Sequence, residues 1–127
     1  MTASQAVVRI DHARAEVHSL EGPVPVARRL HAKTHDTGHH HSDVRDAHEF
    51  FASVCDAIDG YGETLVVGAR HATADFLRYL HKHRPETARR VAAFEVADHQ
   101  TDPELVAYAR KFFEQRARLG GAFGQAG

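Results

Sequence analysis

The chain has a single cysteine and no tryptophan among its 127 residues. One cysteine excludes a disulfide within the chain, and the place of Cys55 on the apolar face of an expected helix predicts a buried thiol rather than a nucleophile. No apolar run approaches the roughly 18 residues of a membrane-spanning helix, and the first residues lack the basic and apolar regions of a secretory signal. These absences predict a cytoplasmic protein with no membrane partner.

Neither sign of charge is in excess. Sixteen Lys and Arg residues and seventeen Asp and Glu residues give a formal net charge of −1 with histidine neutral. Bulk charge alone therefore does not point to a nucleic-acid partner. The chain does contain twelve histidines. The ordinary pKa of a histidine side chain is about 6.5, so these residues gain positive charge as the pH falls below neutrality. Affinity for a polyanion is therefore expected to strengthen as the pH falls.

Glycine is scarce in the middle of the chain, where Gly68 is the only one in residues 63–119. This scarcity excludes the GxGxxG and GxxxxGK[ST] nucleotide-binding patterns. Gly68 separates an apolar strand from a helical pattern that restarts at Thr73, and the expected loop between them carries Arg70 and His71. Backbone N–H groups at a helix start suit an anion such as RNA phosphate; the alternative is a connection that binds nothing. The candidate anion-binding residues are Gly68, Arg70, His71 and Thr73.

A basic stretch lies between the second expected helix and the last expected strand. Such a run is either a solvated surface or a patch that contacts phosphates. Its cationic members are Lys82, Arg84, Arg89 and Arg90.

The first part of the chain has the pattern of short strands. Runs at 6–10 and 15–20 flank a polar turn and predict an antiparallel hairpin. A third extended segment is expected from Val24 to about Leu30, where Pro25 would restrict it to an edge or to a strand start.

The rest of the chain alternates helical and strand patterns. A helix between two strands implies a parallel crossover, so the order β-β-β-α-β-α-β-α predicts one α/β domain with a mixed sheet covered by helices. This domain would span residues 1–119, followed by a flexible tail at 120–127. The expected elements are a helix at 43–58 with Ser42 or Asp43 as N-cap, a strand at 64–67, a helix at 73–83, a strand at 91–96, and a helix capped by Asp102.

Histidines concentrate in residues 31–42, which have almost no apolar side chains and are expected to form an exposed loop. Imidazole groups that converge can hold a divalent metal such as zinc. The alternative is a polar loop that lies along RNA phosphates, because a histidine-rich tract is only compositional evidence. The histidines concerned are His31, His35, His39, His40 and His41.

Three stretches carry a family resemblance: VVRIDHARAEVHSL, TLVVGARHATADFLRYL and VAAFEVADHQTDPELVAYARKFF. With these segments in order, the chain resembles the middle domain of archaeal and eukaryotic peptide-chain release factors and Pelota. It is more closely similar to the small bacterial proteins often labelled translational machinery proteins. The resemblance implies a ribonuclease H-like fold and a ribosome or structured RNA as the partner.

The resemblance also marks two departures from the family pattern. Where the family has a Gly-Pro-Gly type loop followed by lysine, this chain keeps only Gly68, and Arg70 is the substitute for the lysine. Release factors carry a Gly-Gly-Gln loop, whereas the equivalent region at 31–42 contains no such motif. The resemblance therefore implies a non-catalytic module without a cofactor.

Two alternatives remain open from the sequence. Nucleases of ribonuclease H-like fold hold divalent ions with clustered carboxylates. Asp11 ends the first expected strand and Asp98 follows the last, so both could meet at one sheet edge in a metal-dependent nuclease or hydrolase. Asp11 is equally a natural turn residue. The second alternative is a metal-binding protein that uses the histidine loop.

Overall fold

A five-stranded mixed sheet forms the centre of the computed structural model, which describes residues 4–21, 27–32, 40–97 and 101–124. The strands are β1 Gln5–Ile10, β2 Arg14–Ser19, β3 Ala27–His31, β4 Glu63–Gly68 and β5 Val91–Val96. The helices are α1 His40–Ile58, α2 Arg70–His83, α3 Pro85–Arg89 and α4 Asp102–Gly124.

The strand order is β3-β2-β1-β4-β5. Strands β1, β2 and β3 pair in antiparallel fashion, and β4 and β5 continue the sheet parallel to β1. This arrangement confirms the α/β fold with a mixed sheet covered by helices and the parallel crossover from β4 through α2 to β5. Strand β3 lies at the other edge of the sheet from β5, and an edge was one of the two positions expected for the third strand.

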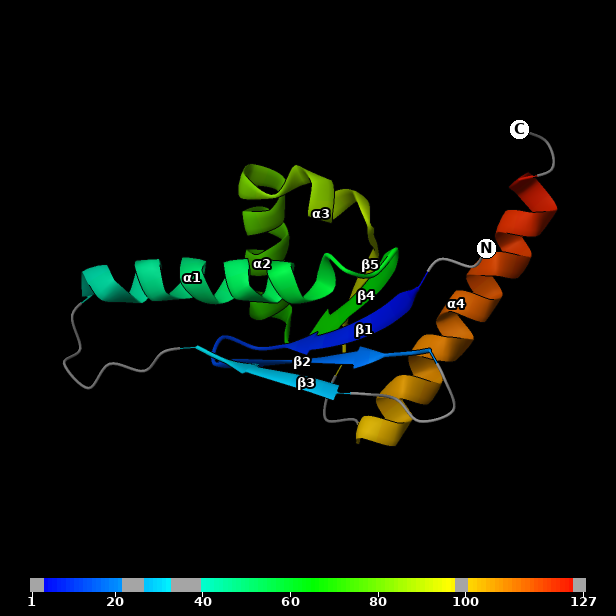
Figure 1. Cartoon of the computed structure of the whole chain (residues 1–127), viewed down its shortest axis with the longest axis horizontal. Coiled ribbons are helices and arrows are strands. Elements are labelled where there is room, and N and C mark those ends of the chain that lie inside the picture. Colours follow the sequence, from blue (N-terminus) through cyan, green and yellow to red (C-terminus); the bar gives the residue numbers. More distant parts are fainter. Residues whose placement is uncertain (1–3, 22–26, 33–39, 98–100, 125–127) are drawn as a thin grey trace.

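Helices cover both faces of the sheet (Figure 1), with α1, α2 and α3 on one side and α4 on the other. Alternate residues of β1 face opposite sides, as strand geometry requires. Val8 and Ile10 pack with α1 and α2, whereas Val7 packs with Leu105 and Phe113 of α4. Over their described residues, none of the helices combines the length and apolar composition that a bilayer crossing requires.

Several element boundaries differ from those expected. Helix α1 begins at His40, so the expected caps Ser42 and Asp43 lie inside it, and residues 40–42 of the expected loop at 31–42 are helical. His31 belongs to β3, while residues 33–39 lie outside the described part of the chain. The short helix α3 was not expected, and α4 continues past Leu119 to Gly124.

The start of α4 is also displaced by one residue from the expected cap, because Thr101 rather than Asp102 closes the first turn. The backbone N–H of Thr101 donates to Glu104 Oε1 at 3.0 Å, and the N–H of Glu104 donates to Thr101 Oγ1 at 3.3 Å. This is a reciprocal capping box. It leaves the carboxylate of Asp102 available for contacts with the sheet.

The carboxylate of Asp102 takes part in an ion-pair network on the α4 face of the sheet. Arg9 of β1, Glu16 of β2 and Arg29 of β3 lie side by side in the strand register. Arg9 Nη2 donates to Asp102 Oδ1 at 2.6 Å and also to Glu16, and Arg29 Nε donates to Glu16 Oε2 at 3.0 Å. Burial opposes the charge of Glu16, but the hydrogen bonds from both arginines leave its pKa below the ordinary value. Three strands and α4 are thereby joined.

His18 lies next to this network and is only 2% exposed. Its Nε2 atom has no hydrogen-bond partner among the described residues. Burial lowers the pKa of His18, and the nearby carboxylates of Asp102 and Glu16 only partly offset that effect. The folded protein therefore favours the neutral imidazole.

Gly68 ends β4 in close contact with β1. A Cβ atom at this position would lie 2.1 Å from the carbonyl oxygen of Ile10, its partner in the parallel register. Only a residue without a side chain allows this approach. Gly68 is therefore required by packing between strands.

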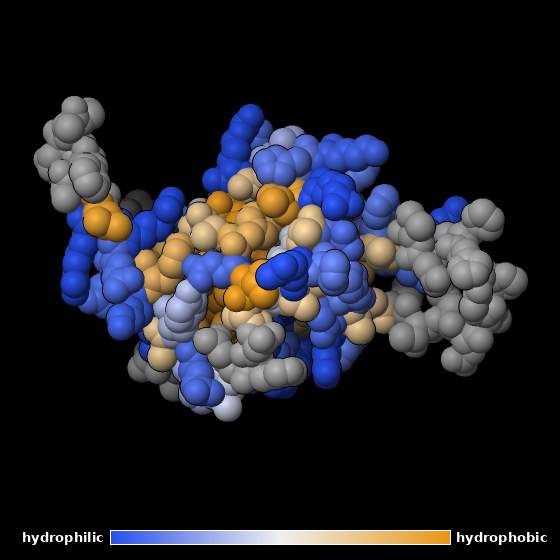
Figure 2. Space-filling model, turned by 180° about the vertical axis from the view of Figure 1, so that it is seen from behind, coloured by the Kyte–Doolittle hydropathy of each residue, from blue (hydrophilic) through white to orange (hydrophobic). Residues whose placement is uncertain are grey.

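Strand β5 forms one edge of the sheet, and its outer side has no partner strand among the described residues. The N–H of Ala97 donates to the carbonyl of Gly68 at 3.1 Å, so by strand alternation the backbone N–H groups of Phe94 and Val96 point away from β4. Val96 is 55% exposed. Figure 2 views the side on which β5 lies and shows hydrophobic residues gathered at its centre, with hydrophilic ones around them.

Replacing Gly68 by alanine should lower the free energy of unfolding by about 1–3 kcal/mol, the usual cost of overpacking. The matched control is Gly60→Ala, because a Cβ there meets nothing within 4 Å. Urea unfolding of both variants measures the difference. A loss for Gly68→Ala no larger than that of the control would contradict the steric argument.

Acid should destabilise the protein through His18. Because its pKa is lowered on folding, the unfolded chain binds the proton first, and stability decreases as the pH falls below the ordinary histidine value of about 6.5. His18→Gln should remove this part of the pH dependence of stability between about pH 7.5 and about pH 5.5. Carboxylates titrate below this range and so do not contribute to the comparison. Parallel slopes for parent and variant in urea unfolding would show that His18 is not responsible.

Candidate nucleic-acid interface

The connection from β4 to α2 is shorter than expected. Only Ala69 lies between the two elements, and it adopts an extended conformation with φ −63° and ψ 147°. The expected helix start at Thr73 is therefore wrong, and Arg70 and His71 lie in the first turn of α2, where both are exposed. Sequence reasoning placed them correctly at the surface but in the wrong kind of structure.

The other two expected anion-binding residues are buried. Thr73 donates its hydroxyl to the carbonyls of Ala69 at 3.1 Å and Arg70 at 3.0 Å, as threonine in a helix often does. Gly68 contacts β1. A ligand at this turn would therefore meet Arg70 and His71 rather than Thr73 or Gly68.

The expected basic stretch divides into paired and unpaired residues. Arg84 donates to Asp56 at 3.2 Å, and Arg90 donates to Asp59 at 2.8 Å. These bonds tie α3 and its flanks to the end of α1, which favours a structural role for both arginines. Arg89 is exposed but pairs with Glu86 at 2.8 Å. Lys82 is exposed and has no ion pair within the described residues.

The exposed side of α2 carries a concentration of positive charge. Along this helix Asp75 is the only acidic residue, and it already contacts His12 at 3.0 Å and Arg78 at 3.7 Å. The side chain of Arg78 is 79% exposed. We call this surface the α2 basic face, and it consists of Arg70, His71, Arg78, His81 and Lys82.

Two depressions adjoin the α2 basic face. An open hollow of about 600 Å³ lies over Ala74, Leu77 and His81. A groove of about 480 Å³ lies between α1 and α2. Both are lined by Arg78 and Lys82, which therefore stand on the ridge between them.

Aromatic rings gather in the groove between α1 and α2. The ring centroid of His48 lies 5.4 Å from that of Tyr79 and 5.4 Å from that of His83. Tyr79 and His83 are 4.9 Å apart. Sequence analysis missed this cluster, although the four-residue spacing of Tyr79 and His83 was a usable signal that both share one face of a helix.

The metal sites expected from the sequence are not assembled within the described residues. Asp11 accepts hydrogen bonds from the backbone N–H groups of Ala13 at 2.7 Å and Arg14 at 2.8 Å, so it serves the hairpin turn. Asp98 lies outside the described residues. The histidine candidates divide into His31, exposed at the end of β3; His40 and His41 on the first turn of α1; and His35 and His39, outside the described residues.

An unexpected group of metal-ligand types occurs instead at Glu16, His18 and Asp102, with one donor atom of each within 4.8 Å of the others. Their carboxylates already bind Arg9 and Arg29. A divalent cation would have to displace two guanidinium groups from a charge-balanced network. The group therefore serves better as a link between α4 and the sheet than as a metal site.

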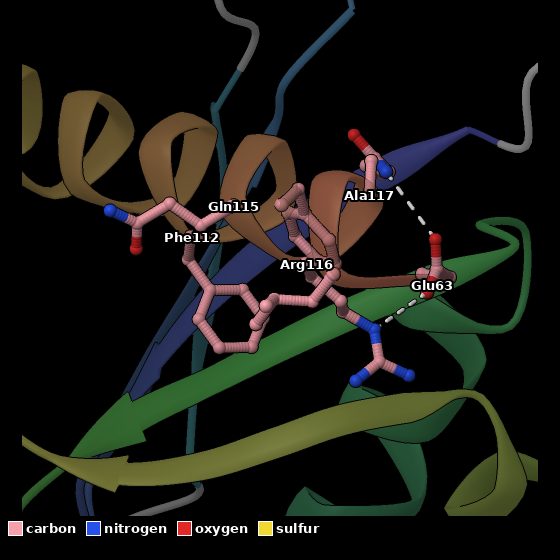
Figure 3. A pocket seen from close by; sticks show the side chains of 8 residues that line it. Glu63, Phe112, Gln115, Arg116 and Ala117 are labelled. Carbon is pink, nitrogen blue, oxygen red and sulfur yellow. Dashed lines mark hydrogen bonds and ion pairs between the residues drawn. The ribbon is translucent and has the colours of Figure 1, made fainter. Parts of the chain in front are cut away.

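A cavity of about 630 Å³ lies on the α4 side of the sheet, near the starts of β1 and β4. Figure 3 shows Phe112 and Gln115 on its wall and Arg116 directed toward Glu63. Arg116 donates to Glu63 at 3.4 Å, and Gln5 donates to the same carboxylate at 3.3 Å. The carboxylate of Glu63 is thus occupied, and the described residues of the cavity wall include no nucleophile with an adjacent base.

The comparisons with known proteins concern structure rather than sequence. No protein-family model and no curated protein matches the sequence. Solved structures do match: Pelota of Archaeoglobus fulgidus, with a TM-score of 0.57 and 17% identity, and the archaeal translation termination factor aRF1, with 0.60 and 14%. The Pelota protein of Thermoplasma acidophilum matches with a TM-score of 0.57 and 14% identity.

These matches cover 98%, 96% and 80% of this chain but 41%, 42% and 30% of the three solved chains. The chain thus spans about two fifths of the length of the first two. At such identities the comparison concerns the fold, and it confirms at that level the resemblance inferred from the sequence. The protein has the fold of a part of Pelota and of the termination factor aRF1.

Proposed function

We propose that this protein is a non-catalytic, translation-factor-like module that binds the ribosome through phosphates of its RNA. The observation that carries the proposal is the α2 basic face, which lies on a fold shared with an archaeal translation termination factor. Such a role needs no cofactor or metal and places the protein in the cytoplasm. The histidine-rich segment at 31–42 is proposed as a second phosphate contact.

The distribution of ion pairs supports α2 as the contact surface. Arg84 and Arg90 neutralise acids of α1 and its C-terminal end, and Arg9 and Arg29 neutralise Glu16 and Asp102. Along α2, in contrast, one acid faces two arginines and a lysine. A protein with a formal net charge of −1 can therefore still present a positive surface to RNA.

Binding to ribosomes should weaken when the α2 basic face loses charge. We expect Arg78→Ala/Lys82→Ala to reduce cosedimentation and to make the plot of log affinity against log salt shallower by roughly 0.7–0.9 for each phosphate that the variant no longer neutralises. The matched control is Lys111→Ala/Arg118→Ala, which removes two exposed cations from α4 on the opposite face of the sheet. Equal effects of the two double variants at every salt concentration would contradict the proposed surface.

The protein should not release nascent peptides. Added to ribosomes that hold peptidyl-tRNA, it should give no hydrolysis above background, because the chain contains no Gly-Gly-Gln motif. A purified release factor provides the positive control. Peptide release that persists after removal of contaminating factors would overturn the non-catalytic assignment.

A further inference from the structure

We propose that the groove between α1 and α2 binds an unpaired RNA nucleotide. The base would stack on the exposed ring of either His48 or His83, which are inclined at 59° to each other, and the neighbouring phosphates would contact Arg78 and Lys82. This inference rests on the proposed function and deepens it, because it specifies single-stranded rather than duplex RNA as the ligand of this surface.

The size and position of the groove fit this ligand. Its volume of about 480 Å³ lies within the range of about 300–1,000 Å³ that is usual for small-molecule sites. The floor includes Phe51, whose ring lies 5.5 Å from that of Tyr79. Phe51 is buried and Tyr79 is half-buried, so the core below holds the aromatic floor in place.

The rings provide a surface for stacking. His48 and His83 are exposed, and both pack against the half-buried Tyr79. His48 comes from α1, whereas Tyr79 and His83 lie one turn apart on α2. Proteins that read single-stranded RNA commonly stack bases on histidine and tyrosine as well as on larger rings. A planar base entering between the two helices would therefore meet ring surfaces from both of them.

The charges at the rim suit a nucleotide rather than an apolar ligand. Arg78 and Lys82 line both the groove and the outer hollow, so a strand lying along the α2 basic face can turn one base inward while its phosphates stay on the ridge. The acidic residue that lines the groove, Asp75, already contacts His12 and Arg78. Bases inside an A-form duplex are already stacked and cannot enter such a groove.

The experiment compares one labelled RNA strand with the duplex that it forms with its complement, using fluorescence anisotropy and the full chain. The parent protein should bind the single strand more tightly. His48→Ala/His83→Ala should weaken single-strand binding roughly 5-fold to 150-fold, the equivalent of 1–3 kcal/mol for one stacked base, and leave duplex binding unchanged. Both side chains are exposed, and the melting temperature checks that the variant is folded.

A ring-preserving variant, His48→Phe/His83→Phe, separates stacking from other effects of histidine. It should retain single-strand binding, and a strand containing 2-aminopurine should show the same fluorescence change with it as with the parent. Equal loss in the Phe and Ala variants would overturn stacking. Equal affinity for single strand and duplex, unaffected by the Ala variant, would also overturn the inference. The proposed function is tested apart from this, by ribosome cosedimentation of Arg78→Ala/Lys82→Ala.

Discussion

The close contact between Gly68 and Ile10 determines where the candidate interface lies. Because no Cβ separates the two backbones, β4 stays paired with β1 up to its last residue. Helix α2 then begins after a single connecting residue, Ala69. So short a connection leaves little freedom in the direction of the helix. The position of Arg78 and Lys82 relative to α1, and hence the groove between the helices, depends on this one contact.

The charged side chains fall into two groups: arginines whose charge is neutralised by nearby acids, and cations of α2 that outnumber the acids around them. On the α4 side, Arg9 and Arg29 are balanced by Glu16 and Asp102, and near α3 two arginines converge on Asp59. Pairs of this kind hold elements together only as long as both partners remain, because removal of one leaves a partly buried charge without its partner. Among the described residues, the exposed cations of α2 do not join α2 to another element through pairs of this kind. Substitutions on α2 can therefore report on binding without a large effect on folding.

Local patterns were sufficient to predict most of the fold. Short β-forming runs on either side of a polar turn predicted the hairpin, and the bounds of β5 agree with those expected at 91–96. The expected helix starts lie one to three residues too late. The helical pattern restarts at Thr73, but the hydroxyl of Thr73 bonds to carbonyls of the preceding residues because α2 already begins at Arg70. Next to Asp102, Thr101 becomes the cap because Glu104 completes its capping box.

The candidate site was less predictable because its parts come from different elements. The sequence indicated Arg70 and His71 through their place at the turn after Gly68, and Lys82 through a local run of basic residues. It could not show that Arg84 and Arg90 are neutralised, because Asp56 lies in α1 and Asp59 directly follows it. The approach of His48 to Tyr79 likewise requires α1 and α2 to pack together. Contacts of this kind follow from tertiary structure and have no signature in the local sequence.

The edge of the sheet at β5, which no strand of the described residues covers, has a consequence for how the protein behaves at high concentration. Sheet edges in natural proteins are usually protected by lysine, proline or a bulge that twists the strand away. The sequence of β5, VAAFEV, has neither lysine nor proline, and its single charge at Glu95 is engaged by the hydroxyl of Tyr108. The irregularity in its pairing with β4 lies at the opposite end from Val96. Colloidal stability should therefore be limited by strand addition at this edge more than by the small net charge.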